Sequence, residues 1–300
     1  MTDVVEARGR FPTGQRTIGP ITVGPIGLGT LQLSVDGRPS RDRAFETVRA
    51  AVECGVTLID TADAYCLSPD EFNHNERLIA DALRACGDEA RGVLIATKGG
   101  HTRPGGAWEV DGRPAYLREA CERSLRALRV DQIDLYQHHR PDPNVPYEAS
   151  IEALRDLRDA GKIRLVGVSN ADVNQIQVAL AVLGDGGLAS VQNEFSPRMR
   201  QTSVELDFCR ERGIAYLLYS PLGGIGGGAR LGRLHPEFER VAQKHEVSAQ
   251  QIALAWELTL GPHVIPIPGC SRPENIVACA AAASVALSAD DLDILNEKAP

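Results

Sequence analysis

Val93-Leu-Ile-Ala-Thr-Lys98-Gly-Gly100 is the stretch that decides the fold: four apolar residues in succession, then polar residues and a glycine pair. An apolar run without alternation is typical of a β-strand covered on both faces, as strands of parallel sheets are. Arg164-Leu-Val-Gly-Val168 has the same character farther along the chain. Longer stretches with apolar residues at three- and four-residue spacing follow both runs and indicate amphipathic helices. Both runs therefore point to parallel β/α units.

The same alternation extends over the whole chain of 300 residues. It predicts eight strands, at residues 26–29, 57–60, 92–97, 132–137, 164–168, 190–192, 214–219 and 263–267. Helices are predicted at residues 41–54, 75–86, 115–128, 147–160, 172–183, 203–212, 248–260 and 273–283. Eight such units with no linker between them predict one α/β domain, a (β/α)8 TIM barrel.

The N-terminal part predicts an addition to this barrel. Residues 17–23 are rich in turn formers between short β-rich runs and predict a β-hairpin. We therefore divide the chain into an N-terminal tail, residues 1–16, and a barrel domain, residues 17–300. A doubly wound sheet is the alternative and would need two halves with a switch point. Gly224-Ile-Gly-Gly-Gly-Ala229 matches a dinucleotide-binding fingerprint, but no clean helix opens there, so we interpret it as a loop.

Charge and composition exclude several classes of protein. The net charge is −8, with 40 acidic against 32 basic residues, which disfavours a nucleic-acid partner. No run approaches the roughly 18 apolar residues needed to span a membrane, and the first residues lack the apolar core of a signal peptide. The seven cysteines form no Cys-x-x-Cys pair and suit a reducing compartment. We expect a cytoplasmic protein, a monomer, without a membrane or nucleic-acid partner.

Polar residues gather where the predicted strands end, which is where barrel enzymes carry their active sites. Strand after strand ends in them: Asp60, Tyr65, Lys98, His138, His139, Asn170, Glu194 and Ser220. Lys98 is one of only four lysines among the 32 basic residues. This scarcity raises the question of why arginine would not serve at that position.

An Asp, a Tyr, a Lys and a His on one rim suit the reduction of a carbonyl group. Hydride transfer to the carbonyl carbon leaves negative charge on oxygen, and a positioned acid must deliver a proton there. A nearby ammonium stabilises the phenolate and so makes tyrosine a better acid. A carboxylate holds that ammonium, and a neutral imidazole orients the oxygen. Lysine suits this task because its charge is compact and its stem is flexible.

Five motifs resemble those of the aldo-keto reductase family: Ile59-Asp-Thr-Ala-Asp-Ala-Tyr65, Ala96-Thr-Lys-Gly-Gly100, Asp134-Leu-Tyr-Gln-His-His-Arg-Pro-Asp-Pro143, Gly167-Val-Ser-Asn170 and Ile267-Pro-Gly-Cys-Ser-Arg-Pro-Glu274. They occur in the family's order, and the resemblance covers about residues 17–295. It implies a (β/α)8 barrel that binds NADPH and reduces aldehydes and ketones to alcohols.

The resemblance also implies four catalytic residues. Tyr65 corresponds to the general acid, Lys98 to the partner that lowers its pKa, and Asp60 to the counter-ion of that lysine. The family spacing places the histidine that orients the carbonyl at His139. Because side chains alternate along a strand, His138 is expected to face the other way.

The cofactor residues implied by the resemblance follow the later strands. Ser169, Asn170 and Gln192 correspond to positions that hold the nicotinamide carboxamide, and Tyr219 to the ring that stacks on the nicotinamide. The pyrophosphate is expected near Ser220, Leu222 and Gly223. Gly269 leads into a predicted helix N-terminus, a natural anion site, where Ser271 and Arg272 are candidates for the 2′-phosphate of NADP. Ala278 and Cys279 depart from the family's adenine-side residues, and we expect Asn275 or Glu274 to substitute for them in part.

A small carbonyl compound is the expected substrate, with Trp108 lining its pocket and Arg140 available for an anionic group. Two alternatives stay open at this point. His138, His139, Asp60 and Glu194 are potential metal ligands, although adjacent histidines on a strand point to opposite faces, so we expect no metal. A nicotinamide-binding regulatory or sensor subunit with weak turnover would keep the same fold.

Overall fold

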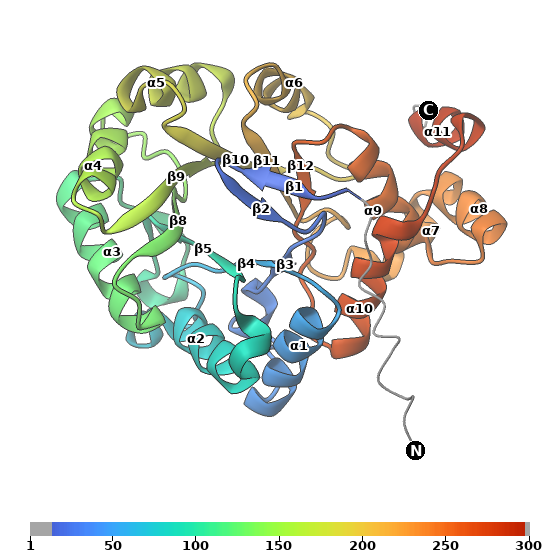
Figure 1. The fold of residues 1–300 in the computed structure, drawn as a ribbon, viewed down its shortest axis with the longest axis horizontal. Helices are drawn as coiled ribbons and strands as arrows, with labels where there is room; N and C mark the ends of the chain where they lie inside the picture. Colours follow the sequence, from blue (N-terminus) through green and yellow to red (C-terminus); the bar gives the residue numbers. More distant parts are fainter. Residues whose placement is uncertain (1–13, 298–300) are drawn as a thin grey trace.

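Eight parallel strands form a closed ring in the computed structural model, which describes residues 14–297 (Figure 1). Their order in the sheet is β12-β11-β10-β9-β8-β5-β4-β3. The ring closes between its first and last strands, where Gly27 N donates to Pro266 O (2.9 Å) and Gly29 N to Pro268 O (3.0 Å). The sequence-based prediction of a (β/α)8 barrel is confirmed, and the doubly wound alternative is wrong.

The strands of the ring are β3 (Leu28–Gly29), β4 (Leu58–Asp60), β5 (Leu94–Gly99), β8 (Ile133–His138), β9 (Ile163–Ser169), β10 (Leu188–Glu194), β11 (Ala215–Tyr219) and β12 (Val264–Pro266). The helices around it are α1 (Arg41–Glu53), α2 (His74–Cys86), α3 (Pro114–Leu128), α4 (Tyr147–Asp159), α5 (Val173–Leu183), α6 (Ser203–Glu211), α9 (Ala249–Thr259) and α10 (Pro273–Ala281). All sixteen agree with the predicted elements to within a few residues.

The N-terminal hairpin covers one end of the ring (Figure 1). Its strands β1 (Arg16–Ile18) and β2 (Ile21–Val23) are antiparallel, and Ile18 is fully buried in the apolar interior of the barrel. Arg16 Nε donates to Val264 O (3.0 Å), at the start of β12. The hairpin therefore lies at the amino ends of the strands and leaves the carboxyl ends open. β1 begins at Arg16, which we placed in the tail; residues 1–13 of that predicted tail lie outside the described residues.

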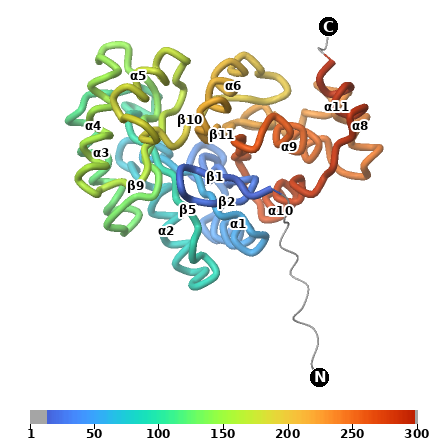
Figure 2. Tube along the Cα trace, turned by 45° about the horizontal axis from the view of Figure 1, so that its top comes forward, coloured from blue at the N-terminus to red at the C-terminus, as the bar shows by residue number. Residues whose placement is uncertain are grey.

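Several elements were not predicted. The loop after β5 contains a second hairpin, β6 (His101–Thr102) with β7 (Glu109–Val110). α7 (Leu231–Leu234) and α8 (Pro236–His245) follow the glycine-rich loop, and α11 (Ala289–Asn296) ends the described chain. α8 and α11 lie side by side outside the ring (Figure 2) because buried Asp291 accepts from Lys244 (2.7 Å) and pairs with His245 (2.9 Å). Within residues 14–297 no helix is long and apolar enough to cross a membrane.

The closing seam of the barrel depends on a small residue at position 29. A Cβ on Gly29 would lie 2.7 Å from Ile267 O, across the contact between β3 and the end of β12. Gly29→Ala is therefore expected to lower the free energy of unfolding by about 1–3 kcal/mol, measured by urea denaturation. Gly24→Ala is the control, because the atom nearest to its Cβ is 3.4 Å away. Equal losses in both variants would contradict the close approach at the seam.

Candidate active site

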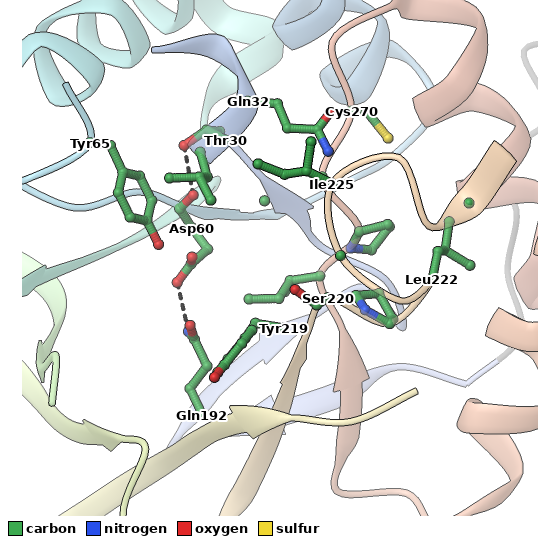
Figure 3. Close-up of a pocket in the computed structure, with 18 of the residues that line it drawn as sticks. Thr30, Gln32, Asp60, Tyr65, Gln192, Tyr219, Ser220, Leu222, Ile225 and Cys270 are labelled. Carbon is green, nitrogen blue, oxygen red and sulfur yellow. Dashed lines mark hydrogen bonds between the residues drawn. The ribbon is translucent and has the colours of Figure 1, made fainter. Parts of the chain in front are cut away.

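A cavity of about 980 Å³ opens at the carboxyl ends of the strands. One part is lined by Tyr65, Trp108 and His139. Another part is lined by Asn275 and Cys279 of α10 and by residues 268–270, which precede that helix. Figure 3 shows Asp60, Tyr65, Gln192 and Tyr219 around one part of the cavity, with Ser220, Leu222 and Ile225 of the following loop beside it. The cavity therefore extends from the centre of the rim to the last β/α unit.

Lys98 contacts two of the other predicted catalytic residues, Asp60 and Tyr65, beneath the floor of this cavity. Its Nζ donates to Asp60 Oδ2 (2.5 Å), to Tyr65 Oη (3.0 Å) and to the main-chain oxygen of Thr61 (2.9 Å). These three acceptors account for all three protons of the ammonium group. The Lys98 side chain is only 1% exposed, so the group is also shielded from water. Lys98 does not itself line the cavity, whereas Tyr65 and Asp60 do.

Asp60 is fixed from the opposite side of the barrel. Its Oδ1 accepts from Gln192 Nε2 (2.7 Å) in β10, the contact marked in Figure 3, and from Gln137 Nε2 (3.3 Å) in β8. A buried carboxylate needs such partners because an unpaired buried charge is costly. Four strands thus cooperate to hold one ion pair, which fixes the position of the Lys98 ammonium.

The charges in this cluster set the protonation of Lys98 and Tyr65. Burial by itself lowers the pKa of Lys98, but the Asp60 carboxylate and the Tyr65 hydroxyl raise it above its ordinary value, so the ammonium is charged at neutral pH. Burial raises the pKa of Tyr65 above its usual value, and the Lys98 ammonium acts in the lowering direction. Tyr65 is therefore a neutral phenol at pH 7 that can donate a proton, beside a cation that stabilises its phenolate.

His139 follows β8 and faces the cavity, and its ring centroid lies 5.8 Å from that of Tyr65. Burial lowers the pKa of His139 well below its usual range, with smaller contributions from His101 and Lys98, so the imidazole is neutral. His138 points away and packs against Tyr147 of α4, with ring centroids 5.5 Å apart. Burial lowers the pKa of His138 to about 4. The alternation expected along this strand is thus observed.

Asn170, directly after β9, links the carboxyl ends of β8 and β11. Its Nδ2 donates to His139 O (3.0 Å), while its Oδ1 accepts from Tyr219 Oη (2.7 Å) and from Arg140 (2.9 Å). Asn170 and Ser220, each directly after a strand, have left-handed backbones with φ of 57° and 54°. Such strained residues gather at ligand sites, where the surrounding structure holds them in place.

The predicted site residues fall into two groups. Besides Asp60, Tyr65 and His139, the cavity wall contains Trp108, Arg140, Ser169, Asn170, Gln192, Tyr219, Ser220, Leu222, Gly269 and Asn275. Gly223 lies between two lining residues, and Ser271 and Arg272 follow the lining segment at the start of α10, but these three do not line the cavity. Within residues 14–297 no cluster of three or more His, Cys, Asp or Glu residues could hold a metal ion.

Sequence reasoning missed other lining residues. Thr30 and Gln32 follow β3, so the rule that directs attention to strand ends could have found them. His101 and Gln250 come from a hairpin and from helix α9, and no local pattern marks them. Thr30 Oγ1 donates to Asp60 O (2.7 Å), which links the first strand end to the catalytic cluster.

Known proteins share both this sequence and this architecture. The sequence pattern of the Aldo/keto reductase family matches residues 25–300. A probable aldo-keto reductase 1 of Glycine max is 35% identical over 280 residues, covering 84% of this chain and 78% of that protein. An uncharacterized oxidoreductase of Schizosaccharomyces pombe is 33% identical over 264 residues, covering 88% and 81%.

Solved structures agree with these matches. An aldo/keto reductase of Klebsiella pneumoniae, crystallised with NADP and acetate, is 29% identical with a TM-score of 0.77 and covers 95% of both chains. The glycerol dehydrogenase of Gluconobacter oxydans is 26% identical with a TM-score of 0.81, covering 95% of this chain and 94% of that one. With its barrel, its strand-end cluster and these matches, the chain belongs to the aldo/keto reductase family, a class of oxidoreductases.

Proposed function

We propose that this protein is an NADPH-dependent carbonyl reductase that converts an aldehyde or a ketone to the alcohol. The observation that carries the proposal is the buried contact of Lys98 with both Tyr65 and Asp60 at the floor of an open cavity. A neutral phenol beside a permanent cation is a proton donor whose conjugate base is stabilised in place. This arrangement suits a reaction in which negative charge develops on oxygen.

In this mechanism the substrate oxygen lies within reach of both Tyr65 and His139. The neutral imidazole of His139 orients the oxygen, and the Tyr65 hydroxyl transfers its proton as charge develops there. Lys98 stabilises the resulting phenolate, and Asp60 keeps the ammonium charged and fixed. The Lys98 and Asp60 side chains lie beneath the cavity and are almost completely shielded from water, which strengthens the electrostatic interactions between them.

NADPH, when bound, supplies the hydride. The wall residues suit such a group: Ser169, Asn170 and Gln192 are candidates for the carboxamide, and Tyr219 for stacking on the nicotinamide. Ser220, Leu222 and the neighbouring Gly223 would approach the pyrophosphate, where glycines allow close backbone contact. Gly269 and Asn275 line the far part of the cavity near the α10 N-terminus, which favours anions, with Ser271 and Arg272 beside them for the 2′-phosphate. The Klebsiella pneumoniae relative crystallised with NADP supports this choice.

The substrate side of the cavity is the part bounded by Trp108 and Arg140. Trp108 is 47% exposed, and its ring meets that of Tyr65 edge-on with centroids 6.4 Å apart. Arg140 is bound to Asn170, so its charge faces the boundary between the substrate and the nicotinamide positions. We assign Trp108 to the wall of the substrate pocket and Arg140 to an anionic group, if the substrate carries one.

The test is the consumption of NADPH, followed by absorbance, with a panel of aldehydes and ketones. We expect saturable turnover with at least some small carbonyl compounds, and unchanged rates when a strong metal chelator is added, because the proposed chemistry uses no metal. NADPH binding without turnover of any carbonyl would refute the proposal and favour a sensor protein. A loss of rate with chelator would point to metal chemistry instead.

A further inference from the structure

His101 is a cavity residue that the proposed mechanism does not use. It begins the β6–β7 hairpin and is 7% exposed, and its ring lines the cavity. The ring meets that of His139 edge-on, with centroids 4.2 Å apart, and that of Trp108 with centroids 5.4 Å apart. His101 is thus in direct contact with His139, the residue proposed to orient the substrate carbonyl.

The hydrogen bond at one ring nitrogen fixes the tautomer of His101. Nδ1 lies 2.7 Å from the main-chain oxygen of Glu109, and a carbonyl oxygen can only accept, so Nδ1 carries the proton. Burial lowers the pKa of His101, which keeps the ring neutral at pH 7. Nε2 therefore offers a lone pair, and no residue within 14–297 is seen to donate to it.

The wall around this acceptor is held rigidly. His101 pairs with Val110 across the hairpin, and its main-chain oxygen accepts from Tyr116 Oη (2.9 Å). The guanidinium of Arg103 stacks over the Trp108 ring at 3.9 Å and donates to Cys66 O (3.0 Å). A preorganised acceptor binds a donor without first losing conformational freedom, which makes it effective in selecting ligands.

We propose that Nε2 of His101 accepts the hydroxyl of a substrate that carries an O–H on the carbon next to its carbonyl group. The inference rests on the proposed carbonyl reduction and narrows its substrates to 2-hydroxy aldehydes and 2-hydroxy ketones. With the carbonyl oxygen at Tyr65 and His139, the neighbouring hydroxyl reaches one ring farther along the wall, to His101. A substrate without that hydroxyl leaves the acceptor unpaired, and sites built on hydrogen bonds discriminate against such analogues.

The test compares hydroxyacetone with butanone, which has a methyl group in place of the hydroxyl. The measured quantity is the ratio of kcat/KM for the two ketones, in the wild type and in variants. His101→Phe keeps a ring but removes the acceptor, and we expect the ratio to fall about tenfold, as for one hydrogen bond. His101→Gln keeps an acceptor at a similar reach and should retain most of the ratio. Differences in intrinsic reactivity of the ketones cancel between variants.

His138→Phe is the matched control, because His138 is also a neutral buried imidazole but faces α4, and neither of its ring nitrogens has a hydrogen-bond partner. The ratio of kcat/KM for the two ketones in His138→Phe should equal that of the wild type.

A ratio within twofold of wild type in His101→Phe, or an equal fall in His138→Phe, would overturn the inference. His101→Asn, whose amide is too short to reach the Nε2 position, gives the same test if the Phe variant does not fold. A wild type that reduces no carbonyl at all would instead refute the proposed function itself.

Discussion

Tyr65→Phe is expected to lower kcat for NADPH-dependent carbonyl reduction by about 10²–10⁴-fold, the usual contribution of a positioned general acid. The phenyl ring retains the packing against Trp108 and His139 and removes only the hydroxyl that Lys98 contacts at 3.0 Å. Without that proton donor, charge on the substrate oxygen has no acid to neutralise it. The measurement is steady-state kcat with the best carbonyl found in the panel.

The loss should be confined to the chemical step. Binding of NADPH, followed by quenching of protein fluorescence, is expected to change little, because the hydroxyl removed is directed at Lys98. Tyr147→Phe is the control: that hydroxyl is buried without a hydrogen-bond partner, and the ring packs on His138 away from the cavity. Tyr65→Phe with turnover within fivefold of the wild type would show that another group supplies the proton.

Lys98→Arg is expected to lower kcat about 100-fold or more although the positive charge is retained. The ammonium fits between three acceptors, Asp60, Tyr65 and the Thr61 main chain, inside a fully buried space. A guanidinium is planar and larger, so it cannot occupy this point without displacing one acceptor, and overpacking of a buried site is itself costly. The displaced acceptor is expected to be the Tyr65 hydroxyl, since Asp60 and the main chain are fixed by their own bonds.

The control for this variant lies on the surface. Lys162 pairs with Glu122 at 2.9 Å, and its side chain is 41% exposed, so Lys162→Arg should change neither kcat nor the melting temperature by a measurable amount. Lys98→Arg is expected to lower both, and thermal denaturation separates the loss of fold from the loss of chemistry. If the folded Lys98→Arg protein kept most of its activity, the argument for a compact charge at this position would be wrong.

The barrel was predictable because the signal for it is local. Apolar runs such as residues 93–96 must be buried on both faces wherever they lie, and amphipathic stretches must pack one face on them. The α8 helix escaped prediction because it follows a glycine-rich loop and is short, with only ten residues. α11 begins with a local capping box, in which Asp291 accepts from Ser288, but its place against α8 depends on Lys244 and His245, which lie far away in the chain.

The sequence by itself determined which strand ends carry Asp60, Tyr65, Lys98 and His139, because parallel strands bring their carboxyl ends to one rim. The chemical roles of these residues remain predictions. Only the tertiary structure decided that Lys98 is sealed from water and contacts both partners, that distant Gln192 holds Asp60, and that His101 lies against His139. These properties depend on burial and on distances between segments far apart in the chain. Such distances arise only when the ring closes, so no local pattern of residues records them.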